Sequence, residues 1–457
     1  MEAIVTPEEM AAIDAAAPEP VDELIRRAGG AVARAALDLL GGAYGHRVTI
    51  LAGRGNNGAD GIEAARRLTA RGVRCLVIDA DASTRKLLPT DLVIDAAYGT
   101  GLRGSFTPPE LPTATTPVLA VDIPSGVAGL TGLTAGEPWR STRTVTFAAW
   151  KPGLLLASGP GLAGEVIVAD IGLDAGSARA HLVDRVAVAS WLPNRPRDTH
   201  KWRSAVRLVA GSPGMTGAAH LAARAAQRGG SGYVRLSTPG VGHDLLAPTE
   251  VVVTTLVDDA WADEVLCDLH RFGALAVGPG LGTEPDVAAE VRRVVTGAQI
   301  ATVVDGDGLR ALGVDAARLI AARPAGAAPV VLTPHDGEYE GLVGSPPGAD
   351  RFAATRDLAR RTGAVVLLKG QTTIVARPDG AVLASTAGDA RLATAGTGDV
   401  LTGVVAALLA QGVPAFEAAA SAAHLHGRAG ALALRRGLVA GDLVALLPAA
   451  FTEVAGG

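Results

Sequence analysis

GRGNNGADG, residues 53–61, directly follows the apolar run RVTILA. Gly53, Gly55 and Gly58 fit the spacing G-x-G-x-x-G, and Asp79 follows about 20 residues later, which outlines a dinucleotide-binding turn between a strand and a helix. Backbone N–H groups and the helix dipole at such a turn attract anions. The pair Asn56-Asn57 departs from this pattern, because its carboxamides, with Asp60 at the expected start of the helix, suit a polar ligand or a hard cation. A tight turn without a ligand is the alternative.

The composition of the 457 residues excludes several classes of protein. The chain is 48% apolar and 19% charged with a net charge of −5, and it shows no basic stripe, so we expect no nucleic-acid partner. MEAIVTPEEM lacks the apolar core of a signal peptide, and residues 400–413 are too short to span a bilayer, which predicts a cytoplasmic protein without a membrane partner. Cys75 and Cys267 are isolated in apolar contexts, so neither a disulfide nor a metal pair is expected.

Strand-like and helix-like segments alternate along the chain. Continuous apolar strands between helices predict mostly parallel sheets that are covered on both faces. The expected strands are 47–52, 74–79, 91–95, 117–122, 142–148 and 165–170, followed by 204–210, 232–236, 250–256, 274–277, 301–305, 329–333, 364–369 and 372–376, with helices near 399–411 and 414–434. The polar, proline-containing segment 192–198 predicts a linker. We therefore predict two α/β domains, a Rossmann-like doubly wound domain over 1–192 and a second domain over 199–457.

Two further strands of the first domain end in aspartate. Asp95 precedes AAYGTGLRGS, and Asp122 precedes IPSG. Because ligands of open parallel sheets bind beyond the carboxyl ends of the strands, Asn57, Asp95, Asp122 and Ser125 are expected to converge there.

These three segments resemble the signatures of NAD(P)H-hydrate epimerases, over residues 1 to about 190. The resemblance implies that Asp122 is catalytic and reaches the hydrated nicotinamide ring, and that Asn57, Asp95 and Ser125 hold a potassium ion. It also implies that the substrate is contacted by Asn56, Asn57, Gly58, Ala59, Asp60, Gly99, Thr100, Gly101, Leu102, Arg103, Gly104, Ser105 and Asp122. Ala59 stands where the family usually has a second glycine.

The segment ATAGTGDVLTG, 393–403, is the sharpest motif of the second half. Gly396 and Gly398 precede a long helix, so their N–H groups form an anion-binding nest that suits a transferring phosphoryl group. Asp399 could then deprotonate the attacking hydroxyl. The alternative is an aspartate that only complements the helix dipole. Further strand ends carry Lys369, TPHDGE (333–338) and GPGLG (278–282), and GMTGAAHLAARAA (214–226) opens a helix.

This set resembles the ribokinase-like fold and, within it, the ADP-dependent NAD(P)H-hydrate dehydratases, from about residue 199 to the end. Phosphoryl transfer from ADP usually requires a magnesium ion, whose ligands the sequence does not assign. The resemblance implies that Asp399 is catalytic. It assigns the hydrate to Ala218, Gly280, His335 and Asp399, and ADP to Lys369, Gly370, Gln371, Thr372, Thr373 and Gly398. Trp202, Asp389 and Arg391 depart from the residues usual in the family.

The combined reading is a bifunctional repair enzyme whose ligands are hydrated NADH or NADPH and ADP, and which assembles as a homo-oligomer of unspecified size. Its first half would interconvert the R and S hydrates, and its second half would dehydrate the S form while ADP yields AMP and phosphate. The alternative is a ribokinase-like small-molecule kinase with a non-catalytic N-terminal interaction domain. A dehydrogenase that uses intact NAD is a weaker third reading. His424 and His426 lie two apart on a predicted helix, so we do not expect a zinc site there.

Overall fold

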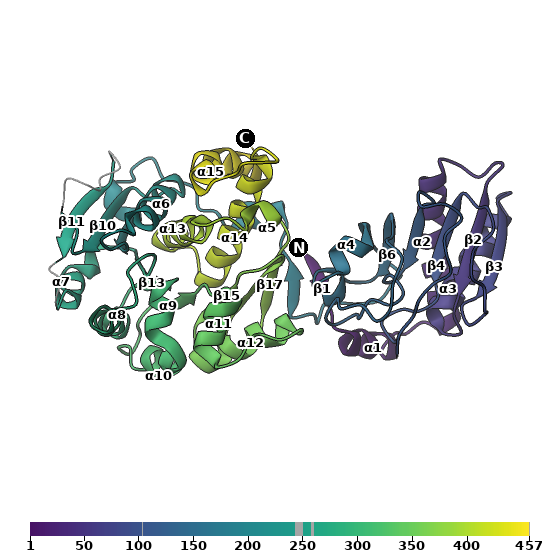
Figure 1. Ribbon diagram of the computed structural model, residues 1–457, viewed down its shortest axis with the longest axis horizontal. Helices are drawn as coiled ribbons and strands as arrows, with labels where there is room; N and C mark the ends of the chain where they lie inside the picture. The colour runs from purple at the N-terminus through teal and green to yellow at the C-terminus, as the bar shows by residue number, and fades with distance from the viewer. Residues whose placement is uncertain (103, 243–249, 257–259, 457) are drawn as a thin grey trace. The chain divides into compact units, whose positions relative to one another are not determined.

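The computed structural model describes residues 1–456 apart from 103, 243–249 and 257–259, and its elements are shown in Figure 1. Its contacts divide the chain into two compact units, Glu2–Ala180 and His181–Gly457, with Met1 grouped with the second. Among the described residues, no helix combines the length and the apolar character that crossing a bilayer requires.

The sheet of the N-terminal unit is parallel throughout, in the order β3-β2-β4-β5-β6-β7. Its strands are β2 (Arg47–Ala52), β3 (Arg74–Asp79), β4 (Leu92–Ala96), β5 (Val118–Val121), β6 (Arg143–Phe147) and β7 (Glu165–Ala169). The chain runs from β2 outward to β3 and then returns to the opposite side of β2. The strand order therefore reverses between β2 and β4, which is where open α/β sheets bind ligands.

Helices cover one face of this sheet and loops cover the other. α2 (Val21–Leu40) and α3 (Asn56–Thr69) pack their alanine-rich sides on β2, β4 and β5 in one core. On the opposite face, Leu87, Phe106 and Trp139 come from loops and pack on alternate strand residues. The unit also contains β1 (Glu2–Ile4), α1 (Pro7–Ala15), the short helix η1 (Pro152–Leu154) and α4 (Gly159–Ala163).

The sheet of the C-terminal unit has the order β8-β17-β16-β15-β14-β13-β12-β9-β10-β11. From β11 to β15 all pairings are parallel, whereas β16 is antiparallel to β15 and to β17. The strands are β8 (Ala180–Leu182), β9 (Ala205–Val209), β10 (Tyr233–Pro239), β11 (Val252–Leu256), β12 (Ala274–Val277), β13 (Ala301–Val304), β14 (Val330–Leu332), β15 (Val365–Leu368), β16 (Thr373–Ala376) and β17 (Val382–Ser385). The order reverses between β9 and β12, which gives this unit its own switch point.

The largest core of the chain lies on one face of this second sheet. Alternate strand residues such as Val206, Leu208 and Val303 pack there against α6 (Thr216–Arg228), α13 (Thr397–Ala410), α14 (Ala415–Leu432) and α15 (Ala440–Ala455). Because strand side chains alternate, the intervening residues face the other side. The remaining helices are α5 (Arg185–Trp191), η2 (Lys201–Ser204), α7 (Ala262–Cys267), η4 (Leu269–Arg271), α8 (Pro285–Gly297), α9 (Asp307–Leu312), η5 (Gly313–Asp315), α10 (Ala316–Ala321), α11 (Asp336–Val343), α12 (Arg351–Thr362) and η6 (Ala390–Leu392).

The predicted strands and the mixed α/β class are confirmed, with strand ends that mostly differ by one or two residues. The helix expected to open near Asp60 begins instead at Asn56. Sequence analysis missed α15 and the strands β8 and β17. Residues 181–192, which precede the predicted linker, group with the C-terminal unit, because α5 contributes Val188 to that unit's core.

Candidate active sites

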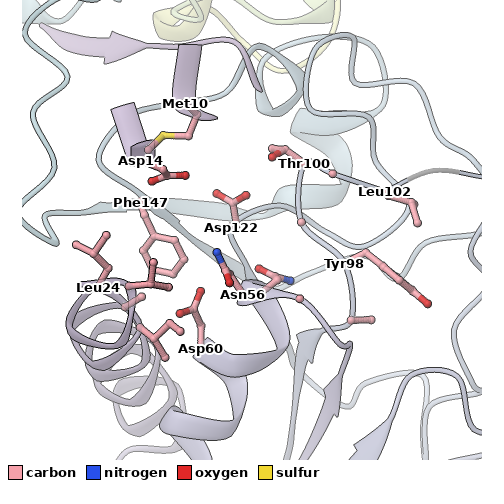
Figure 2. A pocket seen from close by; sticks show the side chains of 18 of the residues that line it. Met10, Asp14, Leu24, Asn56, Asp60, Tyr98, Thr100, Leu102, Asp122 and Phe147 are labelled. Carbon is pink, nitrogen blue, oxygen red and sulfur yellow. The ribbon is translucent and has the colours of Figure 1, made fainter. Parts of the chain in front are cut away.

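A cavity of about 540 Å³ opens at the switch point of the N-terminal sheet. Figure 2 shows side chains from α1, α2, α3 and the loops after β4 and β5 around it. Of the residues assigned to the hydrate, those that line the cavity are Asn56, Asn57, Asp60, Gly99, Thr100, Gly101, Leu102 and Asp122. The segments 56–60 and 99–105 also contain four described residues that do not line the cavity: Gly58, Ala59, Gly104 and Ser105. Arg103 lies outside the described residues.

Close backbone packing explains the glycines of the turn after β2. A Cβ atom on Gly53 would lie 1.9 Å from the carbonyl oxygen of Ala97, and one on Gly58 would lie 1.8 Å from that of Gly53. Both positions therefore exclude any side chain. Gly55 caps α3 without a side-chain hydrogen bond, which leaves N–H groups of the first turn available for an anion. Ala59 lies inside α3, so the alanine that departs from the family pattern adopts ordinary helical backbone.

Asp122 directly follows β5 in an unusual backbone conformation, with φ of 66°. A non-glycine residue with positive φ is uncommon and often marks a functional position. Its Oδ1 accepts a hydrogen bond of 3.1 Å from the hydroxyl of Thr146 and lies 2.8 Å from the Nζ of Lys151. Lys151 is 1% exposed and also donates to Thr146 and to the carbonyl of Phe147. The carboxylate of Asp122 is thus fixed by a buried cation.

Two further carboxyl groups share this cavity. Asp60 projects from α3, and Asp14 projects from α1. Burial, followed by the charges of Asp122 and Asp14, raises the pKa of Asp60 to about 8. Burial also raises the pKa of Asp14, where the ammonium of Lys151 acts in the opposite direction. At neutral pH the site therefore holds at least one uncharged carboxyl group beside Asp122.

The three residues assigned to potassium, Asn57, Asp95 and Ser125, are connected through hydrogen bonds and the backbone of Tyr98 and Gly99. Asp95, 1% exposed, accepts hydrogen bonds from the hydroxyl of Ser125 (2.6 Å) and from its backbone N–H (2.9 Å). The Ser125 hydroxyl also contacts the backbone of Tyr98. At the next residue, a Cβ on Gly99 would lie 3.5 Å from the Oδ1 of Asn57 and 3.2 Å from the Oδ2 of Asp122. This chain of contacts therefore begins at Asp95, passes Ser125 and Gly99, and ends beside Asn57 and the carboxylate of Asp122.

In the C-terminal unit, two predicted ligand residues meet at the switch point. A Cβ on Gly280, whose φ is 63°, would lie 2.9 Å from the Cβ of Ala218. The loops after β9 and β12 are also tied by a 2.7 Å hydrogen bond from Gly211 N–H to the carbonyl of Pro279. Ala218 lies in the first turn of α6, next to this junction.

A buried ion-pair network joins the ends of β13 and β15. The Nζ of Lys369 lies 2.8 Å from the Oδ1 of Asp305 and 3.3 Å from the Oε2 of Glu338. Asp305 is 2% exposed and also accepts hydrogen bonds from Thr333 and Thr402. The ammonium and these hydroxyls hold the pKa of Asp305 below its usual value despite its burial.

The glycine turn before α13 lies against this network. Gly396 caps the helix in the left-handed conformation, with φ of 87°. A Cβ on Gly398 would lie 3.5 Å from the Nζ of Lys369. Burial, then the charge of Asp305, raises the pKa of Asp399 to about 7, with Lys369 opposing. A carboxyl group that titrates near neutrality is well matched to general-base catalysis.

His335 caps α11 in an unusual way. Its Nδ1 accepts hydrogen bonds from the N–H groups of Gly337 and Glu338, while the Glu338 carboxylate accepts one from the N–H of His335. The Nε2 of the half-exposed ring lies 3.5 Å from the Oε1 of Glu338. The backbone N–H of Lys369, the first residue of segment 369–373, donates a 2.8 Å hydrogen bond to the carbonyl oxygen of Pro334. This segment and the TPHDGE turn therefore lie side by side.

The residues that depart from the family pattern have structural partners. Trp202 precedes β9, at the opposite end from the ligand edge, and its ring stacks on Tyr233 at a centroid distance of 4.4 Å. Asp389 and Arg391 form an ion pair, and Arg391 also donates to the carbonyl of Ala433. His424 and His426 are both buried in α14.

Comparison with known proteins covers both units. A family described as NAD(P)H-hydrate dehydratase matches residues 206–450, and one described as YjeF-related protein N-terminus matches 21–86 and 78–153. A protein of Moorella thermoacetica named bifunctional NAD(P)H-hydrate repair enzyme is 37% identical, over 88% of this chain and 87% of its own length. The chain belongs to the bifunctional NAD(P)H-hydrate repair enzyme family.

Other members of this family and its solved structures agree. A repair enzyme of Salinibacter ruber is 36% identical, over 95% of this chain and 92% of its own. The crystal structure of the ADP/ATP-dependent NAD(P)H-hydrate dehydratase of Bacillus subtilis, co-crystallised with ATP and Mg²⁺, is 30% identical and superposes with a TM-score of 0.52, over 59% of this chain and 97% of that one. The predicted family and the ribokinase-like fold of the second unit are thereby confirmed, and a simple kinase with an inert N-terminal domain is not favoured.

Sequence analysis left several residues of these repair-enzyme sites without a role. Lys151 lies in AWKPGL (149–154), and its position shortly after β6 was the available signal. Asp305 directly follows β13 in VVDGDGL, where its position at a strand end was likewise the available signal. Thr146, Thr402 and Asp14 carry no pattern that a single sequence could reveal.

Proposed function

We propose that the chain repairs hydrated NADH and NADPH at two separate sites, epimerising the hydrate in the N-terminal unit and dehydrating its S form in the C-terminal unit at the expense of ADP. One observation carries the proposal: each unit places an aspartate, Asp122 or Asp399, at the carboxyl edge of its sheet, beside a glycine-rich turn that opens a helix. Each turn suits the phosphates of a nucleotide, and each aspartate suits proton transfer at the nicotinamide end.

The N-terminal site fits epimerisation at C6 of the hydrated ring. Inversion requires the hydroxyl group to leave and water to return on the other face, through an iminium-like cation. The Asp122 carboxylate can stabilise that positive charge and exchange protons with the oxygen. Lys151 and Thr146 keep the carboxylate in place, while Met10, Leu24 and Phe147 supply an apolar wall.

The C-terminal site fits phosphorylation of the same hydroxyl group, which is a poor leaving group by itself. Asp399 accepts the hydroxyl proton while the oxygen attacks the β-phosphoryl group of ADP, and AMP departs. The N–H groups of the turn at Gly396–Gly398 and the Lys369 ammonium face the charge that develops on the phosphoryl group. Loss of phosphate from C6 and of a proton from C5 then restores the dihydropyridine.

The residues along the chain of contacts from Asp95 to Asn57 fit a potassium ion. They offer carboxylate, hydroxyl and carboxamide oxygens, the ligands of hard cations. Burial raises the pKa of Asp95, so a bound cation would stabilise its ionised form. A bound potassium ion would add fixed positive charge beside Asp122.

Magnesium would enter the C-terminal site with the nucleotide. In the described part of the chain, no group of three or more His, Cys, Asp or Glu side chains is placed to hold a metal ion. Mg²⁺ commonly binds through phosphate oxygens with few protein ligands. The assignment of Lys369–Thr373 and Gly398 to ADP, like homo-oligomer formation and a cytoplasmic location, stays a prediction.

The test supplies separated R and S hydrates of NADPH with the full-length protein. Without ADP, chromatography should show each epimer converting to the mixture. With ADP and Mg²⁺, absorbance at the wavelength of the reduced cofactor should recover from both epimers. If either reaction fails, the function proposed for the corresponding unit is wrong. Consumption of ATP on an unrelated alcohol, without cofactor recovery, would favour a kinase instead.

A further inference from the structure

We propose that Asp60 is a second acid–base residue of the epimerase, acting on the opposite side of the nicotinamide ring from Asp122. This inference rests on the epimerase function proposed above. It assigns proton transfer to a residue that sequence analysis placed only among the substrate contacts.

The first argument is the difference between the two carboxyl groups. Asp122 is held by Lys151 and Thr146, whereas the carboxyl group of Asp60 has no hydrogen bond or ion pair to any described residue, although Asp60 is only 7% exposed. Its carboxyl oxygens are not among the fully buried side-chain atoms that lack a partner, so they are open to the cavity that Asp60 lines. Figure 2 shows Asp60 entering the cavity from α3, below Asp122. The missing partner of Asp60 is therefore expected to be the substrate.

The second argument is the charge around Asp60. The charged or titratable groups that face it are Asp14 from α1 and Asp122 from the loop after β5, and Lys151 is already paired with Asp122. Leu24 of α2 and Phe147 at the end of β6 add apolar surface to the same cavity. These surroundings disfavour a second carboxylate and keep Asp60 protonated at neutral pH. Asp60 can then donate a proton where Asp122 can accept one.

The third argument is the stereochemistry of inversion. The hydroxyl leaves from one face of the ring and water returns to the other, so a single fixed carboxylate cannot serve both oxygens. In one direction, Asp60 gives its proton to the departing oxygen, the C6–O bond breaks and the N1 electron pair forms the iminium bond. A water molecule then adds to C6 on the other face, and Asp122 takes its proton. One water leaves and one enters, and the reverse turnover or solvent exchange resets the two carboxyl groups.

The experiment compares Asp60→Asn with the wild-type protein in water labelled with ¹⁸O and without ADP. Wild-type inversion with ¹⁸O incorporation at C6 establishes the epimerase function by itself, so its absence would defeat the proposed function rather than this inference. Asparagine keeps the shape and hydrogen bonding but cannot transfer the proton. We expect kcat for inversion and for ¹⁸O incorporation to fall by about 100-fold or more, with KM unchanged within about threefold.

The pH profile gives the second readout. The pKa of about 8 predicts that wild-type epimerisation declines as pH rises through that value, because Asp60 loses its proton. Asp60→Asn should lack this decline, and Asp60→Glu should restore it together with part of the rate. Asp22→Asn, an exposed change of the same charge on α2, should behave as wild type. Asp60→Asn activity above a tenth of wild type, or a KM that rises in step with the fall in kcat, would overturn the assignment.

Discussion

The Nζ of Lys369 lies 2.8 Å from the Oδ1 of Asp305, at the centre of the C-terminal site. Thr402 of α13 donates to the Oδ2 of the same aspartate. Asp305 therefore ties the lysine to the helix that carries Asp399. Substitution of one partner in a buried ion pair leaves a charge uncompensated, which costs far more than the intact pair contributes.

Asp305→Asn should disable the dehydratase and spare the epimerase. Lys369 would keep only Glu338, so we expect the C-terminal unit to lose up to about 3 kcal/mol of unfolding free energy and kcat of dehydration to fall at least about tenfold. Thermal unfolding and the two activities, measured separately, check this. Asp315→Asn, which removes an exposed ion pair with Arg318, is the matched control. Equal losses in the two variants would contradict a special role for Asp305.

The dehydratase rate should rise with pH and level off above about 7. Asp399 has a raised pKa of about 7, and a general base acts only when ionised, so the rate is low below that value. Initial rates between pH 5.5 and 9 at saturating ADP should show this single limb. Asp399→Asn should abolish this rise of rate with pH and lower kcat by at least about 100-fold. A rate that falls between pH 5.5 and 7 would exclude Asp399 as the base.

Local patterns were enough to predict most of the fold. The turn at Gly53–Gly58 and the nest at Gly396–Gly398 have glycine spacings that a single sequence reveals, although Gly53 is also required by its close approach to Ala97 after β4. The neighbouring strands β8 and β17 were missed because three- and four-residue strands carry little periodicity. α15 was missed although it is long, partly because Pro448 interrupts its pattern.

The candidate sites were predicted less completely. Strand-terminal aspartates such as Asp95 and Asp122 could be grouped because parallel strands end on one edge. Lys151, by contrast, reaches Asp122 from a different strand end, and Asp14 enters from a helix far earlier in the chain. Such pairings depend on tertiary packing, and no spacing rule in one sequence reveals them.

Lys151→Met should abolish epimerisation without affecting dehydration. The substitution keeps an unbranched side chain but removes the ammonium group that pairs with the Asp122 carboxylate, so the carboxylate loses its paired cation and its fixed position. We expect kcat to fall about 100-fold or more, by analogy with the loss of a fixed electrostatic group in an active site. Epimer ratios followed by chromatography provide the measurement. Lys151→Arg should retain more activity than Lys151→Met, and equal activity of Lys151→Met and wild type would refute the role of the pair.

Asp60→Asn should stabilise the N-terminal unit, increasingly so as pH rises. The folded protein holds the Asp60 proton up to about pH 8, whereas the unfolded chain releases it near the ordinary aspartate pKa of 3.8. Wild-type stability from this group is therefore complete below about pH 4 and is lost progressively as pH rises to about 8. Since each pKa unit corresponds to about 1.4 kcal/mol, the advantage of the variant should reach several kcal/mol above pH 8. Denaturant unfolding at pH 5 and pH 8.5 measures it, and a constant difference would argue against the raised pKa.

Gly58→Ala should damage the epimerase by distorting the turn that shapes its cavity. The added Cβ would lie 1.8 Å from the carbonyl oxygen of Gly53, a rigid backbone atom that cannot rotate away. The first turn of α3 must therefore shift, and Asn57 and Asp60 shift with it. We expect at least about a tenfold loss of kcat, because small displacements of catalytic groups are costly, and a lower melting temperature of the N-terminal unit. Ile62→Gly, an exposed change in the same helix, is the control and should cost only about 1 kcal/mol of helix stability and leave the epimerisation rate near that of wild type.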